Sequence, residues 1–271
     1  MKPAELGAVV VKSMKAGEWA GNPSPRVHPT AAGMINSVGL QGRGVPYWLE
    51  HELPALIDTG ADVVASIWGN SIDDYHAAAE ALSGAPEQVV AVEVNVSCPN
   101  LEDRSKMFAH SAESTREAIE AAAACGRPRW AKLSPNAADL PEIAVAAHEA
   151  GAEAVVLTNT LLGMVIDTET RRPVLGAKKG GLSGSAMHPV AVRAVYDVHE
   201  AAPDLPIVGV GGTASGSDVV EFLLAGASAV EVGTATFADP RAPRRILKEF
   251  SKWCERHGVA DVAELIGAAH G

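Results

Sequence analysis

Polar side chains that could do chemistry follow several Val-rich runs of this sequence. The run "VEVNV" leads directly into Ser97, Cys98 and Asn100, so a thiol lies between amide side chains. A cysteine thiolate is a nucleophile and a base, whereas an asparagine amide donates and accepts hydrogen bonds. The combination indicates either a catalytic loop or a tight turn that carries a structural cysteine.

Groups of a similar kind end the other apolar runs. Amides suit a flat, carbonyl-rich ligand, lysines can balance an anion or an electron-rich ring, and glycine N–H groups can bind a phosphate. The same residue types also occur in ordinary turns and solvated strand ends. The candidates are Lys12, Ser13, Asn36, Ser37, Asn95, Lys132, Thr158, Asn159, Thr160, Gly211, Gly212, Gly233 and Thr234. No group of His, Asp and Glu follows these runs, so we expect no metal site.

A recurring pattern predicts the elements that position these residues. "LGAVVVKS", "TGADVVAS", "AGAEAVVLTN" and "AGASAVEVGT" each join a Gly-Ala pair to a β-branched run. Glycine caps a helix, and the apolar run that follows is typical of a buried parallel strand. The predicted strands are 8–12, 63–68, 89–96, 129–133, 154–159, 207–210 and 229–233. The predicted helices are 72–82, 113–124, 140–150, 189–201, 217–225 and 241–256, with N-caps at Asp139 and Ser215.

Strands that alternate with helices predict an α/β fold, and a (β/α)₈ TIM barrel over residues 1–271 as a single domain fits best. The alternative is an open doubly wound sheet. "GVGG" and "VGT" at the last two strands favour the barrel, because barrels often bind phosphate there. The strand count is one short, so we expect a first strand and helix to be missing ahead of "KPAEL". The segment 22–44 is expected to be a long excursion with a small hairpin, and 161–185 to be irregular.

Composition excludes several classes of protein. The formal net charge of −11 argues against nucleic acid as a partner, because phosphate contacts need clustered basic residues. The odd count of three cysteines fits a reducing compartment better than a disulfide framework, so we expect a cytoplasmic location. No run of 18 apolar residues occurs, so no membrane span is expected.

The chain resembles the dihydroorotate dehydrogenase family. The matching segments are "VVVKSM", "GNPSPR", "INSVGLQG", "VNVSCPN", "AKLSPN", "GGLSG", "GVGG" and "EVGTATF", in the family's order across nearly the whole chain. The segment "NTLLGMVIDTETRRPVLGAKKGGLSG" is most similar to the cytosolic NAD-linked subclass. The resemblance implies oxidation of dihydroorotate to orotate through FMN in pyrimidine biosynthesis.

The resemblance also implies a role for each matching residue, with Cys98 as the general base. The implied substrate contacts are Lys12, Asn36, Ser37, Gly39, Leu40, Asn95, Asn100, Asn159 and Thr160. The implied FMN contacts are Lys12, Ser13, Asn95, Lys132, Thr158, Gly184, Gly211, Gly212, Gly233 and Thr234. The implied partner is an electron-transfer subunit that carries FAD and a 2Fe–2S cluster and passes electrons to NAD. The implied assembly is a heterotetramer with a homodimer of this chain at its core.

The sequence departs from the family pattern in three places. The "ASG" flavin-binding turn of the family's first strand is absent, Gly42 replaces the usual Asn, and Ser185 replaces a common Pro. Two alternatives therefore stay open: an FMN barrel similar to dihydropyrimidine dehydrogenase, and an inactive truncated barrel.

Overall fold

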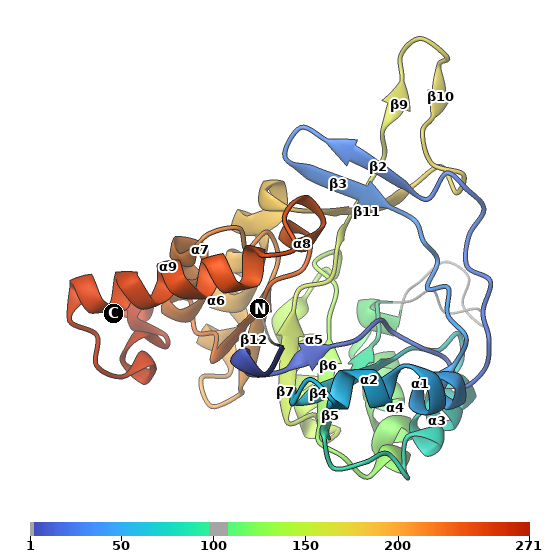
Figure 1. The fold of residues 1–271 in the computed structure, drawn as a ribbon, viewed down its shortest axis with the longest axis horizontal. Coiled ribbons are helices and arrows are strands. Elements are labelled where there is room, and N and C mark those ends of the chain that lie inside the picture. Colours follow the sequence, from blue (N-terminus) through green and yellow to red (C-terminus); the bar gives the residue numbers. More distant parts are fainter. Residues whose placement is uncertain (1–2, 98–107) are drawn as a thin grey trace. The chain divides into compact units, whose positions relative to one another are not determined.

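The computed structural model of the chain describes residues 3–97 and 108–271, in which strands alternate with helices (Figure 1). The chain divides into two compact units. The first is formed by Met1–Asn22, Val38–Leu133 and Ala137–Val155. The second is formed by Pro23–Ser37, Ser134–Asn136 and Val156–Gly271.

Parallel strands form the core of the first unit. They are β1 (Val9–Val10), β4 (Val63–Ile67), β5 (Val89–Asn95) and β6 (Arg129–Lys132), adjacent in that order. All five residues of β4 are buried, as expected for a Val-rich strand covered on both faces. The helices of this unit are α1 (Val45–His51), α2 (Leu53–Ile57), α3 (Ile72–Ala81), α4 (Ala112–Ala121) and α5 (Leu140–Glu149), with short 3₁₀ turns at Pro3–Glu5, Phe108–His110 and Ala122–Cys125.

The second unit combines parallel strands with a small antiparallel sheet. Strand β7 (Ala154–Leu157) begins in the first unit and continues into the second, where β12 (Ile207–Val210) and β13 (Ala229–Glu231) follow it in the sheet. The antiparallel sheet has the order β2 (Val27–Thr30), β3 (Gly33–Asn36), β11 (Gly180–Ser183) and β8 (Leu161–Gly163). Strands β9 (Ile166–Asp167) and β10 (Arg172–Pro173) form a hairpin that projects beyond it (Figure 1).

The helices of the second unit follow its strands. They are α6 (His188–Ala201), α7 (Gly216–Leu224), α8 (Ala235–Ala238) and α9 (Ala242–His257), with 3₁₀ turns at Ser185–Met187, Val262–Leu265 and Ala268–His270. Ser215 caps α7 with a reciprocal capping box, and Asp139 caps α5 by accepting the backbone N–H of Glu142. Both predicted N-caps are therefore confirmed.

The predicted α/β class is confirmed, because all seven predicted strands are present and form one parallel sheet. The six predicted helices are also present, whereas α1, α2 and α8 were not predicted. Closure into an eight-stranded barrel, the single domain over 1–271 and a preceding strand stay predictions. No helix within the described part of the chain is both long and apolar enough to cross a membrane.

The prediction that 161–185 is irregular is wrong, because this segment contains β8, β9, β10 and β11. These strands have two to four residues, and β9 and β10 are exposed, so they lack the alternation of apolar and polar residues that marks a longer strand. Gly180 and Gly181 are required in β11, since a side chain on either would collide with the Asn36 backbone or with Thr160.

Candidate active site

The predicted site residues divide between the two units. Lys12, Ser13, Gly39, Leu40, Asn95 and Lys132 belong to the first, and Asn36, Ser37, Thr158, Asn159, Thr160, Gly184, Gly211, Gly212, Gly233 and Thr234 belong to the second. Cys98 and Asn100 lie outside the described residues, and their roles stay predictions.

A buried ion pair joins the carboxyl ends of two neighbouring strands in the first unit. The Lys132 Nζ at the end of β6 lies 3.0 Å from Glu93 Oε2 in β5, and the Glu93 side chain is only 3% exposed. Glu93 was not predicted as a site residue. The signal was present, because a carboxylate inside the apolar run "VEVNV" has to find a partner when the strand is buried.

A chain of hydrogen bonds runs from this ion pair to the end of β5. Ser66 Oγ of β4 donates to Glu93 Oε1 at 2.9 Å, and Ser66 Oγ lies 2.9 Å from Ser13 Oγ, which follows β1. Asn95 Nδ2 donates to Ser13 Oγ at 3.2 Å. The structure thus brings the predicted residues Ser13, Asn95 and Lys132 into one network, through Ser66 and Glu93, which were missed.

Asn95 is fixed on its other sides as well. Its Oδ1 accepts the backbone N–H of Ser97 at 3.2 Å, and its carbonyl oxygen accepts the Tyr75 hydroxyl at 2.9 Å. Ser97 Oγ donates to the Lys132 carbonyl at 3.4 Å. Hydrogen bonds therefore hold the backbone of Asn95 and Ser97, the last described residues before Cys98.

Three further predicted residues of the first unit are Lys12, Gly39 and Leu40. Lys12 is exposed and lies between β1 and Ser13. Gly39 and Leu40 have φ angles of 73° and 59°. A leucine in this left-handed region is unusual, and such strain often accompanies functional loops.

Glycines shape a tight turn in the second unit, after β12. Gly211 and Gly212 have φ angles of 147° and 74°, and a Cβ at Gly212 would lie 2.7 Å from the His188 Cβ. The buried His188 at the start of α6 holds the turn, since its Nδ1 lies 2.9 Å from the Gly211 carbonyl oxygen and its Nε2 lies 2.9 Å from Glu221 Oε2. His188 was missed, because a lone histidine before a proline carries no spacing signal.

Two buried hydroxyls accompany this turn. Thr158 follows β7 and Thr213 follows Gly212, and the side-chain oxygens of both have no hydrogen-bond partner among the described residues. The strands are neighbours, because the Thr158 N–H donates to the Val210 carbonyl at 2.7 Å. Buried polar atoms are nearly always paired, so hydroxyls and glycine N–H groups here form a donor set for a polar ligand.

Gly184, Gly233 and Thr234 lie on the same side of the parallel strands in this unit. The Gly184 carbonyl would lie 2.9 Å from a Cβ at Gly212, which places β11 beside the turn. Gly233 and Thr234 follow β13, and Gly233 has open space on its Cβ side among the described residues. Open space and a bare backbone allow close approach of a ligand.

The predicted amides of the second unit belong to a further cluster. The side-chain oxygen of Asn159 accepts the Thr160 N–H at 2.7 Å, and Asn36 Nδ2 donates to the Gly181 carbonyl at 3.4 Å. Asn136, which was not predicted, joins them by donating to the Thr160 carbonyl at 3.1 Å and accepting the Leu162 N–H at 2.9 Å. Ser37 donates its backbone N–H to the Arg26 carbonyl.

The two described cysteines are not activated. Burial raises the pKa of the Cys125 thiol, which is only 1% exposed, and burial also raises the pKa of Cys254 in α9. Both raised pKa values disfavour the thiolate at neutral pH. In residues 3–97 and 108–271 no group of three or more His, Cys, Asp and Glu side chains is placed to hold a metal ion.

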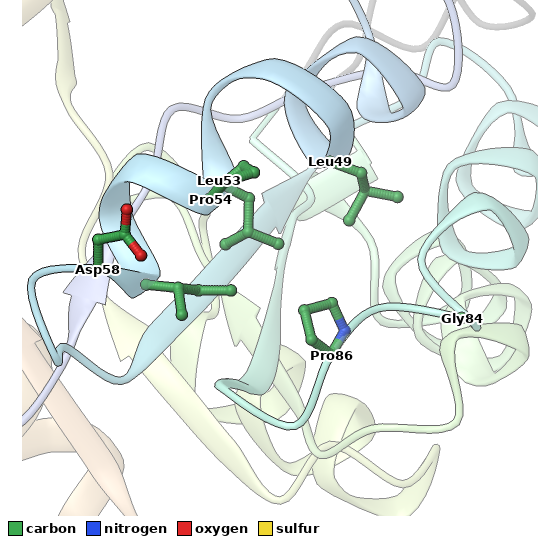
Figure 2. Close-up of a pocket in the computed structure, with 7 residues that line it drawn as sticks. Leu49, Leu53, Pro54, Asp58, Gly84 and Pro86 are labelled. Carbon is green, nitrogen blue, oxygen red and sulfur yellow. The ribbon is translucent and has the colours of Figure 1, made fainter.

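A pocket of about 420 Å³ lies elsewhere in the first unit (Figure 2). Its walls come from α1, α2 and the loop before β5, and are formed by Leu49, Leu53, Pro54, Ile57, Asp58, Gly84 and Pro86. These residues precede β4 and β5 in the chain, so the pocket lies at the amino ends of the strands. Functional residues of parallel α/β folds gather at the carboxyl ends, and we therefore assign no role to this pocket.

Comparison with known proteins gives the family. A family model described as dihydroorotate dehydrogenase matches residues 1–253 of this chain. The chain belongs to the dihydroorotate dehydrogenase family. The resemblance in the sequence is thereby confirmed.

The curated relatives carry a more specific name. The relatives from Bacteroides thetaiotaomicron, Desulforamulus reducens and Desulforudis audaxviator are 42%, 43% and 45% identical to this chain. Each match covers 98% of this chain and 87% of the relative. All three are named dihydroorotate dehydrogenase B (NAD(+)), catalytic subunit.

Proposed function

We propose that this chain is an oxidoreductase that oxidises dihydroorotate to orotate in pyrimidine biosynthesis, as the catalytic subunit of an NAD-linked enzyme. The observation that carries the proposal is the family match over nearly the whole chain, with relatives that share one specific name. The polar network at the carboxyl ends of β5 and β6 supports it, because a redox reaction on a carbonyl-rich ring needs fixed amides and cations.

The reaction removes two hydrogens from neighbouring carbons of the substrate. Dihydroorotate loses a proton from C5 and a hydride from C6, and a double bond forms between these carbons. FMN, when bound, supplies the two-electron acceptor for the hydride. Cys98 takes the proton as general base, and the Asn95–Ser97 hydrogen bond fixes the backbone that leads into this residue.

The donor set in the second unit fits FMN. The buried hydroxyls of Thr158 and Thr213 lack partners among the described residues, and Gly233 has open space on its Cβ side among the same residues. Backbone N–H groups and hydroxyls of this kind suit a phosphate and its ribityl chain. The residues that would hold FMN are Lys12, Ser13, Asn95, Lys132, Thr158, Gly184, Gly211, Gly212, Gly233 and Thr234.

Amides and backbone groups would hold the substrate. The proposed contacts are Lys12, Asn36, Ser37, Gly39, Leu40, Asn95, Asn100, Asn159 and Thr160. A pyrimidine ring presents alternating carbonyl and N–H groups, which side-chain amides match in both directions. The proposed partner is a subunit that would carry FAD and a 2Fe–2S cluster and would supply the route for electrons to NAD, within a heterotetramer built on a homodimer of this chain.

Anaerobic reduction of the bound flavin tests the proposal. We expect dihydroorotate to bleach the visible flavin spectrum of the purified chain, and Cys98→Ala to slow this reduction about 10²- to 10⁴-fold while FMN stays bound. Cys254→Ala is the matched control, because Cys254 lies on α9 with a raised pKa. Bleaching by a dihydropyrimidine without the carboxylate instead would favour the dihydropyrimidine dehydrogenase-like alternative, and a chain that binds no flavin would favour the inactive one.

A further inference from the structure

We propose that Glu93 is a positioning residue for the active site, and this inference rests on the proposed function. On one side its carboxylate holds the ammonium of Lys132. On the other side it fixes the direction of the hydrogen-bond chain that ends at Asn95. The direction set by this buried charge matches the direction that the Ser97 N–H requires, so one orientation of the Asn95 amide satisfies both ends of the chain.

The far end of the chain fixes the orientation of Asn95. The Ser97 backbone N–H can only donate, so the Asn95 atom that faces it at 3.2 Å must be the oxygen Oδ1. The nitrogen Nδ2 then faces Ser13 Oγ at 3.2 Å. Because an amide nitrogen only donates, Ser13 must accept this hydrogen bond.

The two serines transmit the direction. A hydroxyl has one proton, and the Ser13 proton is directed to Ser66 Oγ at 2.9 Å because Asn95 already donates to Ser13. The Ser66 proton is in turn directed to Glu93 Oε1 at 2.9 Å. An ionised carboxylate only accepts, so the direction required at Glu93 agrees with the direction required at Asn95.

Loss of the charge removes this constraint without changing the shape of the side chain. A glutamine at position 93 can present either an oxygen or an N–H₂ group to Ser66. When it presents N–H₂, both serine protons can reverse, and Asn95 can turn its oxygen toward Ser13. The Ser97 N–H then loses its acceptor, and Lys132 loses its ion pair with the Glu93 carboxylate at the same time.

The test compares Glu93→Gln with Ser66→Ala, and uses Glu153→Gln, an exposed glutamate of the same unit, as the control. The first readout is the side-chain amide NMR signal of Asn95 in ¹⁵N-labelled protein, assigned by its loss in Asn95→Asp. We expect both test variants to shift this signal and to speed exchange of its protons about tenfold or more, because a hydrogen bond in a charged network is lost. We expect no change in the control.

The second readout is flavin reduction by dihydroorotate. We expect Glu93→Gln to lower kcat about 10- to 100-fold with little change in KM, and Glu93→Asp, which keeps the charge, to recover part of the loss. A role in folding alone would not produce this difference between kcat and KM. If Glu93→Gln does not fold, Ser66→Ala carries the test, since it breaks the chain without removing a charge.

The outcomes separate the two proposals. An unchanged Asn95 signal in the folded test variants, or wild-type flavin reduction in Glu93→Gln, would overturn the role of Glu93 even when the wild-type protein oxidises dihydroorotate. A wild-type protein whose flavin dihydroorotate does not reduce would overturn the proposed function, whereas the Asn95 signal would still report the coupling to Glu93.

Discussion

The side chains of Lys132 and Glu93 form an ion pair, in which the lysine side chain is 16% exposed and the glutamate side chain 3%. Removing one partner of such a pair leaves a charge that water cannot solvate, which typically costs about 3–5 kcal/mol. Among the described residues, Ser66 still donates to Glu93 when the lysine is removed, and a hydroxyl does not replace an ammonium.

Lys132→Met is therefore expected to lower the free energy of unfolding by about 3–5 kcal/mol, measured by urea denaturation of the flavin-free chain. The control is Arg116→Met, because Arg116 pairs with Glu149 at the surface, where 40% and 60% of the side chains are exposed. The control should lose no more than about 1 kcal/mol. An equal loss of unfolding free energy in both variants would show that the buried ion pair stabilises the fold no more than the surface pair does.

Two glycines predicted to contact FMN give a second matched pair at this scale. Gly212→Ala forces a Cβ against His188 at a φ of 74°, whereas Gly233→Ala meets nothing within 4 Å. We expect Gly212→Ala to lose at least about 1–2 kcal/mol of stability, and Gly233→Ala to stay within about 0.5 kcal/mol. Thermal unfolding of both variants checks this, and a stable Gly212→Ala protein would contradict the proposed strain.

A carboxylate of α9 links this helix to α7 by a hydrogen bond to the first residue of α7. Glu249 of α9 accepts the Gly216 backbone N–H at 3.0 Å and the Arg245 guanidinium at 2.9 Å. The Arg245 side chain, followed by the Gly216 N–H, lowers the pKa of Glu249. A negative side chain beside the first N–H groups of a helix also interacts favourably with its dipole.

This lowered pKa predicts a pH dependence. The pKa of Glu249 in the folded protein lies below its value in the unfolded chain. Its contribution to the free energy of unfolding is therefore complete above the unfolded pKa, and is lost as the pH falls through the folded pKa. Glu249→Gln should therefore be less stable than wild type at neutral pH, by less than about 1 kcal/mol for this part-exposed group, and the difference should shrink in acid. Urea denaturation at both pH values measures it, with Glu255→Gln on the exposed part of α9 as the control. A difference that persists in acid would contradict the assignment.

The elements themselves were predictable where one physical signal dominates. Strands β4 and β5 are runs of β-branched residues, and Ser215 with Asp218 forms a capping box that is readable in the sequence. The strands of 161–185 could not be predicted in this way. Their pairing partner β3 is distant in the sequence, and their glycines are selected by close backbone contact rather than by strand propensity.

At the scale of the whole molecule, the family match extends over residues 1–253, and it carries a prediction about the direction of electron flow. The relatives are named as catalytic subunits, which implies that another subunit completes the enzyme. We expect the isolated chain to accept one pair of electrons from dihydroorotate per flavin, and to reduce NAD only when the electron-transfer subunit is added. Absorbance at the NADH band, with and without that subunit, measures this. Rapid NAD reduction by the chain alone would refute the proposed route.

Some residues of the candidate site could be predicted from the sequence and others could not. Lys132 and Asn95 end two of the predicted strands, so their position follows from the strand pattern alone. Glu93, Ser66, Asn136 and His188 were missed, because each acts by contacting another residue that is distant in the sequence. A sequence read locally shows which side chains end a strand, but the network that orients them depends on strand order and register.

The distribution of thiols also has a practical use. The chain has three cysteines, and Cys125 is sealed in the core with a raised pKa. Replacing Cys254 by serine on α9 would leave Cys98 as the one remaining thiol outside that core position. A thiol reagent added to this variant would then react at position 98, so that the rate of modification would measure the reactivity of the proposed base and the protection that a bound substrate gives it.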